Sequence, residues 1–184
     1  NKIDGNVTFA DDASYGGGYN TEFRNNLITG NSTFTINGSN HLYEANALGT
    51  GSVYNGNTIY NLNGSGNLYL NQGEKSTYNG NLTITRIANG YTRAFGSGNI
   101  INGNFSYTNT ASGDADFGSA TVSTPISGTV NMNVNTTAVS GISIYRLVNQ
   151  TTGGKINIQN SKGFDIRSDS LKVDSLNVLW YRGG

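Results

Sequence analysis

The sequence predicts an all-β chain folded as a parallel β-solenoid (β-helix) of about seven coils, with three short strands in each coil. Three observations predict it. The composition favours strands and turns, with 26 Gly, 11 Tyr and one Pro among 184 residues. A glycine motif returns every 23 to 26 residues along the chain. Apolar and polar residues alternate after each copy of that motif, which is the pattern of a strand with one buried face.

The repeat is marked by a glycine at the first corner of each coil. The motif Tyr-Asn-Gly-Asn occupies residues 54–57 and 78–81, and Ile-Asn-Gly-Asn occupies residues 101–104. The seven corner glycines are Gly5, Gly30, Gly56, Gly80, Gly103, Gly128 and Gly154. Their successive spacings are 25, 26, 24, 23, 25 and 26 residues, and a spacing this constant is typical of stacked structural repeats.

The residues around each corner fall into columns of like chemistry. In the fourth coil, Leu82 and Ile84 are the second and fourth residues after the glycine, and the polar Thr83 lies between them. Another apolar column lies two residues before the glycine and consists of Ile3, Ile28, Tyr54, Tyr78, Ile101 and Ile126. We expect the coils to stack about 4.8 Å apart, with each column continuous along the solenoid.

A second corner follows about ten residues after the first in most coils, for example at residues 64–66, 88–90 and 111–113. Asn40 takes the place of its glycine in the second coil. The 13 to 16 residues that remain before the next first corner leave room for two short strands, which predicts three sides. The alternative is an antiparallel meander, sandwich or barrel, because Asn-Gly is also a strong hairpin signal. The constant repeat length favours the solenoid.

The repeat is regular over residues 1–128 and less regular over residues 129–184. Ile142 and Ile144 are the first and third residues after the second-corner glycine Gly141, whereas Leu68 and Leu70 are the second and fourth residues after Gly66. A one-residue shift would turn the isoleucines outward, so we expect the backbone of the second corner to compensate for it and keep them inside. The tail residues Leu176, Val178 and Trp180 predict one further strand on the first face, which is the side formed by the strands that follow the corner glycines. Neither terminus has the polar cap that closes a solenoid, so we expect residues 1–184 to be a single segment of a longer chain.

Composition argues against several function classes. The net charge is +0, with 11 basic and 11 acidic residues and no basic cluster, so we expect no nucleic-acid binding. No apolar run approaches 18 residues, and we expect no membrane insertion. The chain has no cysteine, which excludes a disulfide framework and a thiolate metal site. We expect no cofactor.

Clustered carboxylates are the candidate catalytic groups, because glycoside hydrolysis needs paired carboxylates. The acidic candidates are Asp11 with Asp12, Asp114 with Asp116, and Asp165 with Asp169 and Asp174. Arg93 occupies the position of Asp116 in the coil below, so we expect these two residues to form an ion pair. The single histidine, His41, has no second histidine or cysteine with which to hold a metal, and we expect it to be an exposed polar residue. We predict that the chain is not an enzyme.

Two further columns are candidate surfaces. The first contains Asn6, Asn31, Asn57, Asn81 and Asn104, which predict a ladder of side-chain amides, with sugar recognition as the alternative. In the second column, Tyr43 and Tyr69 take the same place in adjacent coils and Tyr91 lies close by. These tyrosines predict either a cross-strand ladder or an exposed contact for a carbohydrate or a protein.

Residues 78–85 read Tyr-Asn-Gly-Asn-Leu-Thr-Ile-Thr, and residues 63–70 read Asn-Gly-Ser-Gly-Asn-Leu-Tyr-Leu. This repeated motif resembles the repeat regions of very large secreted β-solenoid surface proteins of gliding and marine Gram-negative bacteria. These proteins include adhesin-like chains and subunits of hook-like or filamentous appendages. The resemblance covers about residues 1–120. It implies export to the cell surface, great length and attachment to surfaces or prey cells, and it implies no catalytic or ligand-binding residues.

From the repeat and this resemblance we expect a structural or adhesive module of an extracellular protein. It would act as a stiff rod that displays binding surfaces or assembles with copies of itself into an oligomer or filament. A surface glycan or another cell-surface target would be its partner. A carbohydrate-binding or polysaccharide-active β-helix protein is the alternative.

Overall fold

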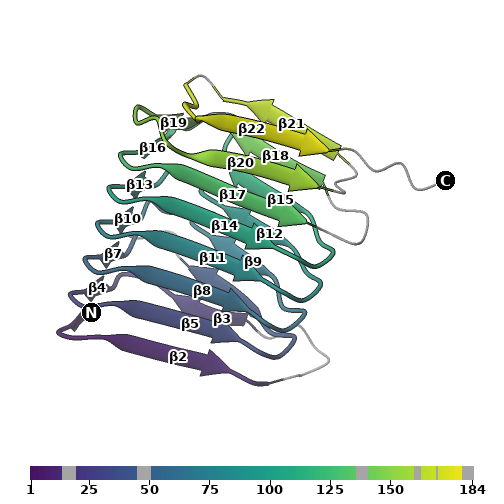
Figure 1. The fold of residues 1–184 in the computed structure, drawn as a ribbon. Coiled ribbons are helices and arrows are strands. Elements are labelled where there is room, and N and C mark those ends of the chain that lie inside the picture. Colours follow the sequence, from purple (N-terminus) through teal and green to yellow (C-terminus); the bar gives the residue numbers. More distant parts are fainter. Residues whose placement is uncertain (14–19, 45–50, 136–140, 160–162, 169, 180–184) are drawn as a thin grey trace.

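The computed structural model describes residues 1–13, 20–44, 51–135, 141–159, 163–168 and 170–179. Every regular element in these residues is a β-strand, and the strands form three parallel sheets that wind around one core. Figure 1 shows the coils stacked in chain order, from β2 at one end to β22 at the other. The predicted three-sided parallel solenoid is therefore confirmed.

Each coil passes through sheets A, B and C in that order. Sheet A contains β1 (Lys2–Ile3), β4 (Leu27–Ile28), β7 (Val53–Tyr54), β10 (Thr77–Tyr78), β13 (Ile100–Ile101), β16 (Thr124–Ile126) and β19 (Leu147–Asn149). Sheet B contains β2 (Val7–Asp11), β5 (Ser32–Ile36), β8 (Thr58–Leu62), β11 (Leu82–Arg86), β14 (Phe105–Asn109), β17 (Val130–Asn135), β20 (Lys155–Gln159) and β22 (Ser175–Leu179).

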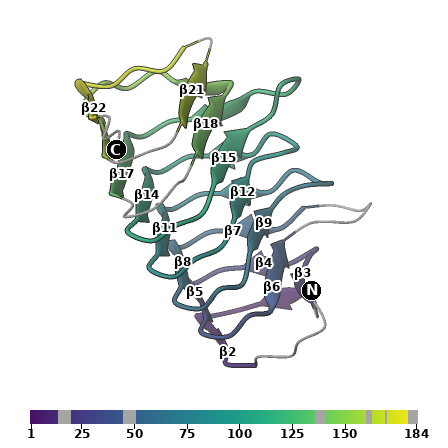
Figure 2. The same ribbon diagram turned by 90° about the vertical axis from the view of Figure 1, so that its right-hand side faces the viewer.

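Sheet C lies on the side that Figure 2 turns toward the viewer. It contains β3 (Asn20–Phe23), β6 (His41–Glu44), β9 (Leu68–Leu70), β12 (Thr92–Ala94), β15 (Ala115–Gly118), β18 (Gly141–Tyr145) and β21 (Gly163–Arg167). Tyr43 and Tyr69 lie on β6 and β9, and Tyr91 directly precedes β12, so sheet C presents the candidate contact surface.

The core consists of the inward columns that the alternation predicts. Leu82 pairs with Phe105 and Ile84 pairs with Tyr107 in the next coil, and all four side chains are buried. Tyr54 and Tyr78 stack inside sheet A with ring centroids 5.0 Å apart and planes inclined by only 4°. Burying a large apolar side chain contributes roughly 2 kcal/mol, so the solenoid gains stability with each added coil.

The first-corner glycines pile directly on one another because the coils approach too closely for a side chain. A Cβ atom on Gly80 would lie 2.5 Å from the carbonyl oxygen of Gly56, and one on Gly103 would lie 2.5 Å from that of Gly80. Gly30, Gly56 and Gly128 meet the coil below in the same way. A backbone carbonyl cannot move aside without breaking the stacking, so close approach requires glycine at this column.

The seventh predicted corner glycine does not join this column. Gly154 lies over Val130, with its hypothetical Cβ 2.1 Å from the Val130 carbonyl oxygen. Correspondingly, Ile156 pairs with Met132 and not with Val130. Gly154 therefore lies two residues further along the coil below than the spacing of the corner glycines predicts, which aligned it with Gly128. A displacement of two residues keeps every inward side chain inside, because the strand period is two.

The predicted ladder of Asn6, Asn31, Asn57, Asn81 and Asn104 is confirmed in connecting each coil to the next, but its bonds run from side chain to backbone and not from amide to amide. Each side-chain oxygen accepts a hydrogen bond from the backbone N–H of the next member, at 2.8 Å from Asn31 to Asn6 and 2.9 Å from Asn57 to Asn31. The side-chain amide ladder lies two residues earlier, where Asn79 donates to Asn55 and Asn102 donates to Asn79, both at 2.7 Å. These bonds tie the first corner of each coil to that of its neighbour.

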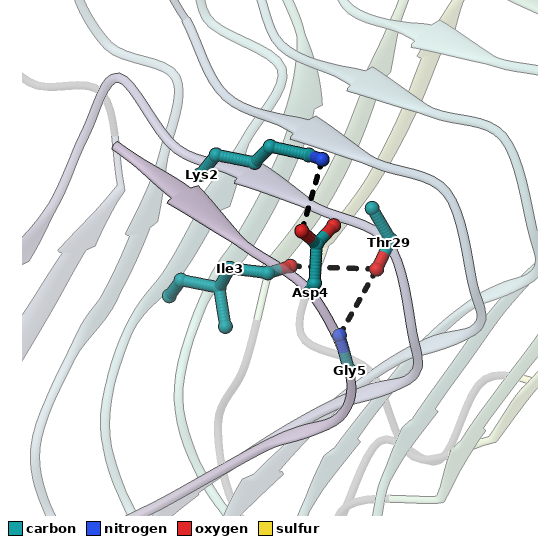
Figure 3. Close-up of polar contacts among 5 residues, drawn as sticks. All are labelled: Lys2, Ile3, Asp4, Gly5 and Thr29. Atoms are coloured by element: carbon teal, nitrogen blue, oxygen red, sulfur yellow. Dashed lines mark hydrogen bonds and ion pairs between the residues drawn. The ribbon is translucent and has the colours of Figure 1, made fainter.

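Figure 3 shows the first corner at the N-terminal end, where a threonine takes the place of this asparagine. The Thr29 hydroxyl accepts a hydrogen bond from the Gly5 backbone N–H at 3.0 Å and donates to the Ile3 carbonyl oxygen at 3.4 Å. Lys2 and Asp4 form an exposed ion pair at 2.9 Å beside it. The hydroxyl thus connects the first two coils as the amides connect the later ones.

The C-terminal coils keep the register that the sequence requires. Ile142 pairs with Ala115 and Ile144 with Phe117, and the inward column of sheet C continues without interruption. The corner therefore absorbs the one-residue change as expected. The further strand on the first face is confirmed as β22, in which Leu176 pairs with Ile156. Trp180, predicted to belong to this strand, lies outside the described residues.

Candidate functional site

The most prominent outward feature of sheet C is a tyrosine strip, which we define as Tyr43, Tyr69 and Tyr91. Tyr43 and Tyr69 are paired in register on β6 and β9. Their rings stack with centroids 4.5 Å apart and planes inclined by 17°, while Tyr91 meets Tyr69 edge-on at 6.0 Å. All three side chains are half-buried. The predicted cross-strand ladder is thus confirmed for the first two residues, and the contact role of the strip stays a prediction.

A small hydrogen-bond network holds the strip against the second corner. Asn67 donates from its amide to the Tyr69 hydroxyl at 3.1 Å and accepts from the Tyr91 backbone N–H at 2.8 Å. The Asn67 backbone N–H donates to Nδ1 of His41 at 3.1 Å. The imidazole lies 6.1 Å from the Tyr69 ring. His41 is therefore a half-buried acceptor that fixes the corner, and not the freely exposed residue that we expected.

Asp116 is bonded to the tyrosine strip through Tyr91 and does not form an ion pair. The Tyr91 hydroxyl donates a hydrogen bond to its carboxylate. Burial raises the pKa of the Tyr91 phenol above its ordinary value, and the hydrogen bond to Asp116 is the second largest cause of this rise. The ion pairs among the described residues are Lys2–Asp4, Arg24–Glu22 and Arg167–Asp165, so the predicted pairing of Arg93 with Asp116 is wrong. The tyrosine hydroxyl reaches the carboxylate where the more exposed arginine side chain does not.

The ring stacking limits what the strip can bind. The faces of Tyr43 and Tyr69 point along the solenoid axis and cover one another, because the rings repeat at the coil spacing. The strip therefore presents ring edges and not ring faces, beside a polar network in which the Tyr69 hydroxyl is bonded to Asn67 and the Tyr91 hydroxyl to Asp116. Such a surface suits hydrogen bonding to hydroxyl-rich partners better than the stacking of a sugar ring on an aromatic face.

The carboxylates suggested by the sequence are each engaged in a separate local contact. Asp114 accepts from the Gly141 backbone N–H at 2.6 Å, and Asp12 accepts from the Asn37 amide at 2.6 Å. Asp11 accepts from Thr21 at 3.0 Å, and Asp174 accepts from the Gly153 backbone N–H at 2.9 Å. Asp169 lies outside the described residues. Within the described ranges, no group of three His, Cys, Asp or Glu residues is placed to hold a metal ion.

A buried carboxyl group that the sequence pattern does not reveal lies at the third corner, between sheets C and A. Glu44 ends β6 with its side chain pointing inward and only 1% exposed. Ser76 donates to its Oε1 at 2.8 Å, Tyr54 donates to the same oxygen at 3.4 Å, and the Asn71 amide donates to Oε2. Burial raises the pKa of the Glu44 carboxyl to about 7, and the hydrogen bonds from Ser76, Ser52, Asn71 and Tyr54 only partly oppose this.

This group is part of a polar column that continues into the next coils. Asn71, at a positive φ of 58°, accepts from the amide of Asn99 and from the Tyr78 hydroxyl at 3.5 Å. The Ser76 backbone N–H donates to the Asn99 side chain at 3.2 Å. The third corner is thus held by buried side-chain hydrogen bonds, whereas the first corner is held by stacked glycines and by exposed asparagine hydrogen bonds. The one signal of this buried site in the sequence is that Glu44, a charged residue, occupies an inward position of its strand.

A second buried charge lies at the corner between sheets B and C. Arg86 ends β11 and is 0% exposed. Its Nε donates to Thr92 at 3.0 Å, and its guanidinium donates to the carbonyl oxygens of Gly66 at 3.2 Å, Ala88 at 3.3 Å and Tyr91 at 3.0 Å. Burial lowers the pKa of Arg86 to about 10. The arginine therefore joins the corners of two adjacent coils beneath the tyrosine strip.

Replacing Arg86 by methionine is expected to lower the free energy of unfolding by about 2 kcal/mol, because buried carbonyl oxygens lose their donors while the aliphatic volume is kept. Urea denaturation of Arg86→Met measures the loss. Arg93→Met, a change at an exposed arginine seven residues away, is the control and is expected to have almost no effect. Equal stabilities of the two variants would contradict the structural role of Arg86.

One open pocket of about 380 Å³ lies near the C-terminal end, and it is lined by Ala120, Tyr145, Arg146, Ile166, Arg167 and Ser168. Both arginines are already engaged. Arg146 donates to the Ala120 carbonyl oxygen at 2.8 Å, and Arg167 pairs with Asp165 at 2.9 Å. The pocket is therefore a weaker candidate for ligand binding than the tyrosine strip.

The described residues include no helix long and apolar enough to cross a membrane. Comparison with protein-family models, with curated proteins and with solved structures found no match to the chain. The functional argument therefore depends on the solenoid itself and on the side chains that its faces display.

Proposed function

We propose that the chain is a structural and adhesive module of a large extracellular surface or appendage protein. In this role the solenoid is a stiff rod, and the tyrosine strip is its contact surface. The observation that carries the proposal is the unbroken register of all three sheets combined with an outward strip of hydroxyl-bearing rings on one of them.

The rod is stiff because every coil is hydrogen-bonded to its neighbours along three sides. The eight strands of sheet B, about 4.8 Å apart, give the rod a length of roughly 34 Å. Each coil contacts only the coils before and after it, so a longer chain would extend the same rod without a new core. Such a structure suits a spacer that holds a binding surface away from its point of attachment.

The outer face of sheet B supports assembly with copies of the chain. The outward side chains of its first six strands include Thr33, Thr83, Ser106 and Asn131, and no lysine, arginine, aspartate or glutamate points outward there. An uncharged face meets no charge repulsion when it packs against a second copy. Sheet C, in contrast, carries the charges of Arg93 and Asp116.

The alternative function is carbohydrate binding without a rod-like spacer role, or turnover of a polysaccharide. The hydroxyl-rich strip favours sugar contact for either function. The separate engagement of Asp114 and Asp116 favours binding over turnover, because glycoside cleavage needs two carboxylates facing one bond.

A glycan array and intact bacterial cells, probed with the labelled chain, test the proposal. Binding is expected for the unchanged chain, and it is expected to fall at least about tenfold in the double variant Tyr43→Ala, Tyr69→Ala, because hot-spot tyrosines contribute about 2 kcal/mol. Tyr145→Ala, at the far end of sheet C, is the matched control.

Absence of binding to any glycan or cell, or binding that the double variant keeps in full, would contradict the adhesive role of the strip. Polysaccharide cleavage that is abolished by Asp114→Ala would instead establish the enzymatic alternative. A melting curve of each variant separates loss of contact from loss of fold.

A further inference from the structure

The stacked pair Tyr43–Tyr69 has a chemical property that is independent of any adhesive role. The two residues are direct partners on adjacent parallel strands, with rings 4.5 Å apart and nearly parallel. Their side chains leave equivalent backbone positions, so the ring carbons beside each hydroxyl group face the neighbouring ring. Both side chains are partly accessible to solvent. A small oxidant can therefore reach two phenols that are already held in contact.

A second tyrosine stack in the same solenoid provides an internal comparison. Tyr54 and Tyr78 are paired in register with centroids 5.0 Å apart and planes inclined by 4°, but both are 0% exposed. Their ring geometry resembles that of the outer pair, but they are closed to solvent, and their hydroxyl groups donate to Glu44 and Asn71. A small oxidant in solution cannot touch either of these buried rings, so we expect this pair to stay unoxidised in the folded chain.

We propose that Tyr43 and Tyr69 form a site of oxidative cross-linking, at which a dityrosine bond joins the second coil to the third. The co-reactant is a one-electron oxidant of the class formed by hydrogen peroxide and a haem peroxidase.

The reaction balances as follows. Each phenol gives up one electron and one proton and becomes a phenoxyl radical. The two radicals join through a new carbon–carbon bond between the ring positions beside the hydroxyl groups. The hydrogen atoms at these two carbons then move to the phenol oxygens as the rings regain aromaticity. The two electrons and two protons released reduce one hydrogen peroxide to two water molecules, and the chain loses two hydrogen atoms.

The geometry selects this pair over the other neighbour in the strip. Tyr91 meets Tyr69 edge-on, with planes inclined by 65° and centroids 6.0 Å apart, and its hydroxyl is held by Asp116. Its reactive ring carbons are therefore not placed over those of Tyr69. We expect the 43–69 bond to form in preference to the 69–91 bond.

The cross-link would strengthen the rod where it forms. It closes a loop between residues 43 and 69 and restricts the unfolded chain, as a disulfide of similar loop length does. This chain has no cysteine, so a tyrosine cross-link is a covalent connection between coils that its composition allows.

The experiment treats the folded chain at low concentration with horseradish-type haem peroxidase and a limiting amount of hydrogen peroxide. We expect blue dityrosine fluorescence, a monomer that has lost two hydrogen atoms in its intact mass, and one cross-linked peptide pair containing residues 43 and 69. The melting temperature of the cross-linked monomer is expected to rise. Tyr69→Phe is expected to lose the intramolecular cross-link entirely, while Tyr145→Phe, which removes another half-buried surface tyrosine, keeps it.

Three results would overturn the proposal: cross-links only between separate molecules, a monomeric cross-link that persists in Tyr69→Phe, or a cross-link between Tyr54 and Tyr78 in the folded chain. Because Tyr69→Phe keeps the stacked ring, its fold is expected to survive, and circular dichroism confirms this before oxidation. Glycan binding is not measured here, so failure of this proposal and failure of the adhesive function are distinguishable.

Discussion

Replacing Gly80 by alanine is expected to lower the free energy of unfolding by about 3 kcal/mol, because the new methyl group has no room. It would lie 2.5 Å from the Gly56 carbonyl oxygen and 2.6 Å from its carbon, both part of the backbone of the coil below. Relief requires the two coils to separate at the first corner, which weakens the hydrogen bonds of the neighbouring asparagine columns. The loss is steric, since the backbone of Gly80 is not in the left-handed region. Urea denaturation measures it.

Gly163→Ala is the matched control for this prediction. Gly163 begins β21 on sheet C, and a Cβ atom placed there meets no atom within 4 Å. The substitution is expected to leave stability unchanged or to raise it by less than about 1 kcal/mol, because alanine restricts the unfolded chain. Similar losses for Gly80→Ala and Gly163→Ala would show that the coils are not in close contact at the first corner.

The second large effect concerns pH and the buried carboxyl group of Glu44. Its pKa is about 7 in the folded chain against 4.5 as the ordinary value. A raised folded-state pKa means that the folded state favours the protonated form. The stabilising contribution is therefore fully present below pH 4.5 and is lost as the pH rises through about 7. Integrated over this interval, the loss is about 3 kcal/mol.

Glu44→Gln is expected to remove this pH dependence. The amide keeps the shape of the protonated carboxyl group and carries no charge at any pH, so the variant should be more stable than the unchanged chain at pH 8 and no more stable at pH 4. Urea denaturation at a series of pH values measures the difference. Glu22→Gln, at an exposed glutamate paired with Arg24, serves as the control and should keep the original slope. A Glu44→Gln variant with the slope unchanged would contradict the buried, uncharged state of Glu44.

The columns of the solenoid were predictable because two simple constraints determine them. A glycine is needed wherever two corners touch, as at Gly56, Gly80 and Gly103, and an apolar residue is needed wherever a strand faces the core. Both constraints act on single positions and repeat with each coil, so they appear directly in the sequence. The outward place of Tyr43 and Tyr69 followed from the same alternation.

The interactions that involve particular side chains could not be predicted in this way. No glycine recurs at a fixed spacing at the third corner, so the repeat pattern does not indicate where this corner lies. The buried hydrogen bonds from Ser76 and Asn71 to Glu44 are therefore seen only in the structure. Arg86 occupies the inward position taken by Leu62 in the coil below, where the pattern leads one to expect an apolar residue. The corner spacing does not indicate the two-residue displacement at Gly154 either, because a shift of two residues preserves the alternation of buried and exposed side chains.

The hydrogen-bond partner of Asp116 is a second example of a side-chain interaction that the sequence does not predict. Register correctly placed Arg93 and Asp116 next to each other on β12 and β15. It could not show that the hydroxyl of Tyr91, two residues before Arg93 in the chain, would reach the carboxylate first. Sequence spacing determines which backbone positions are neighbours, while side-chain length and direction determine which of the neighbouring groups form a bond.

The central claim is that each coil lies directly over the previous one in parallel register, and cross-strand nuclear Overhauser effects at Thr83 test it most directly. The structure predicts effects from the backbone protons of Thr83 to those of Ile59 on one side and Ser106 on the other. An antiparallel meander instead predicts effects between Thr77 and Leu82 across the Asn79-Gly80 turn, with none to residues one coil away. That second pattern would contradict the solenoid and every role proposed for its faces.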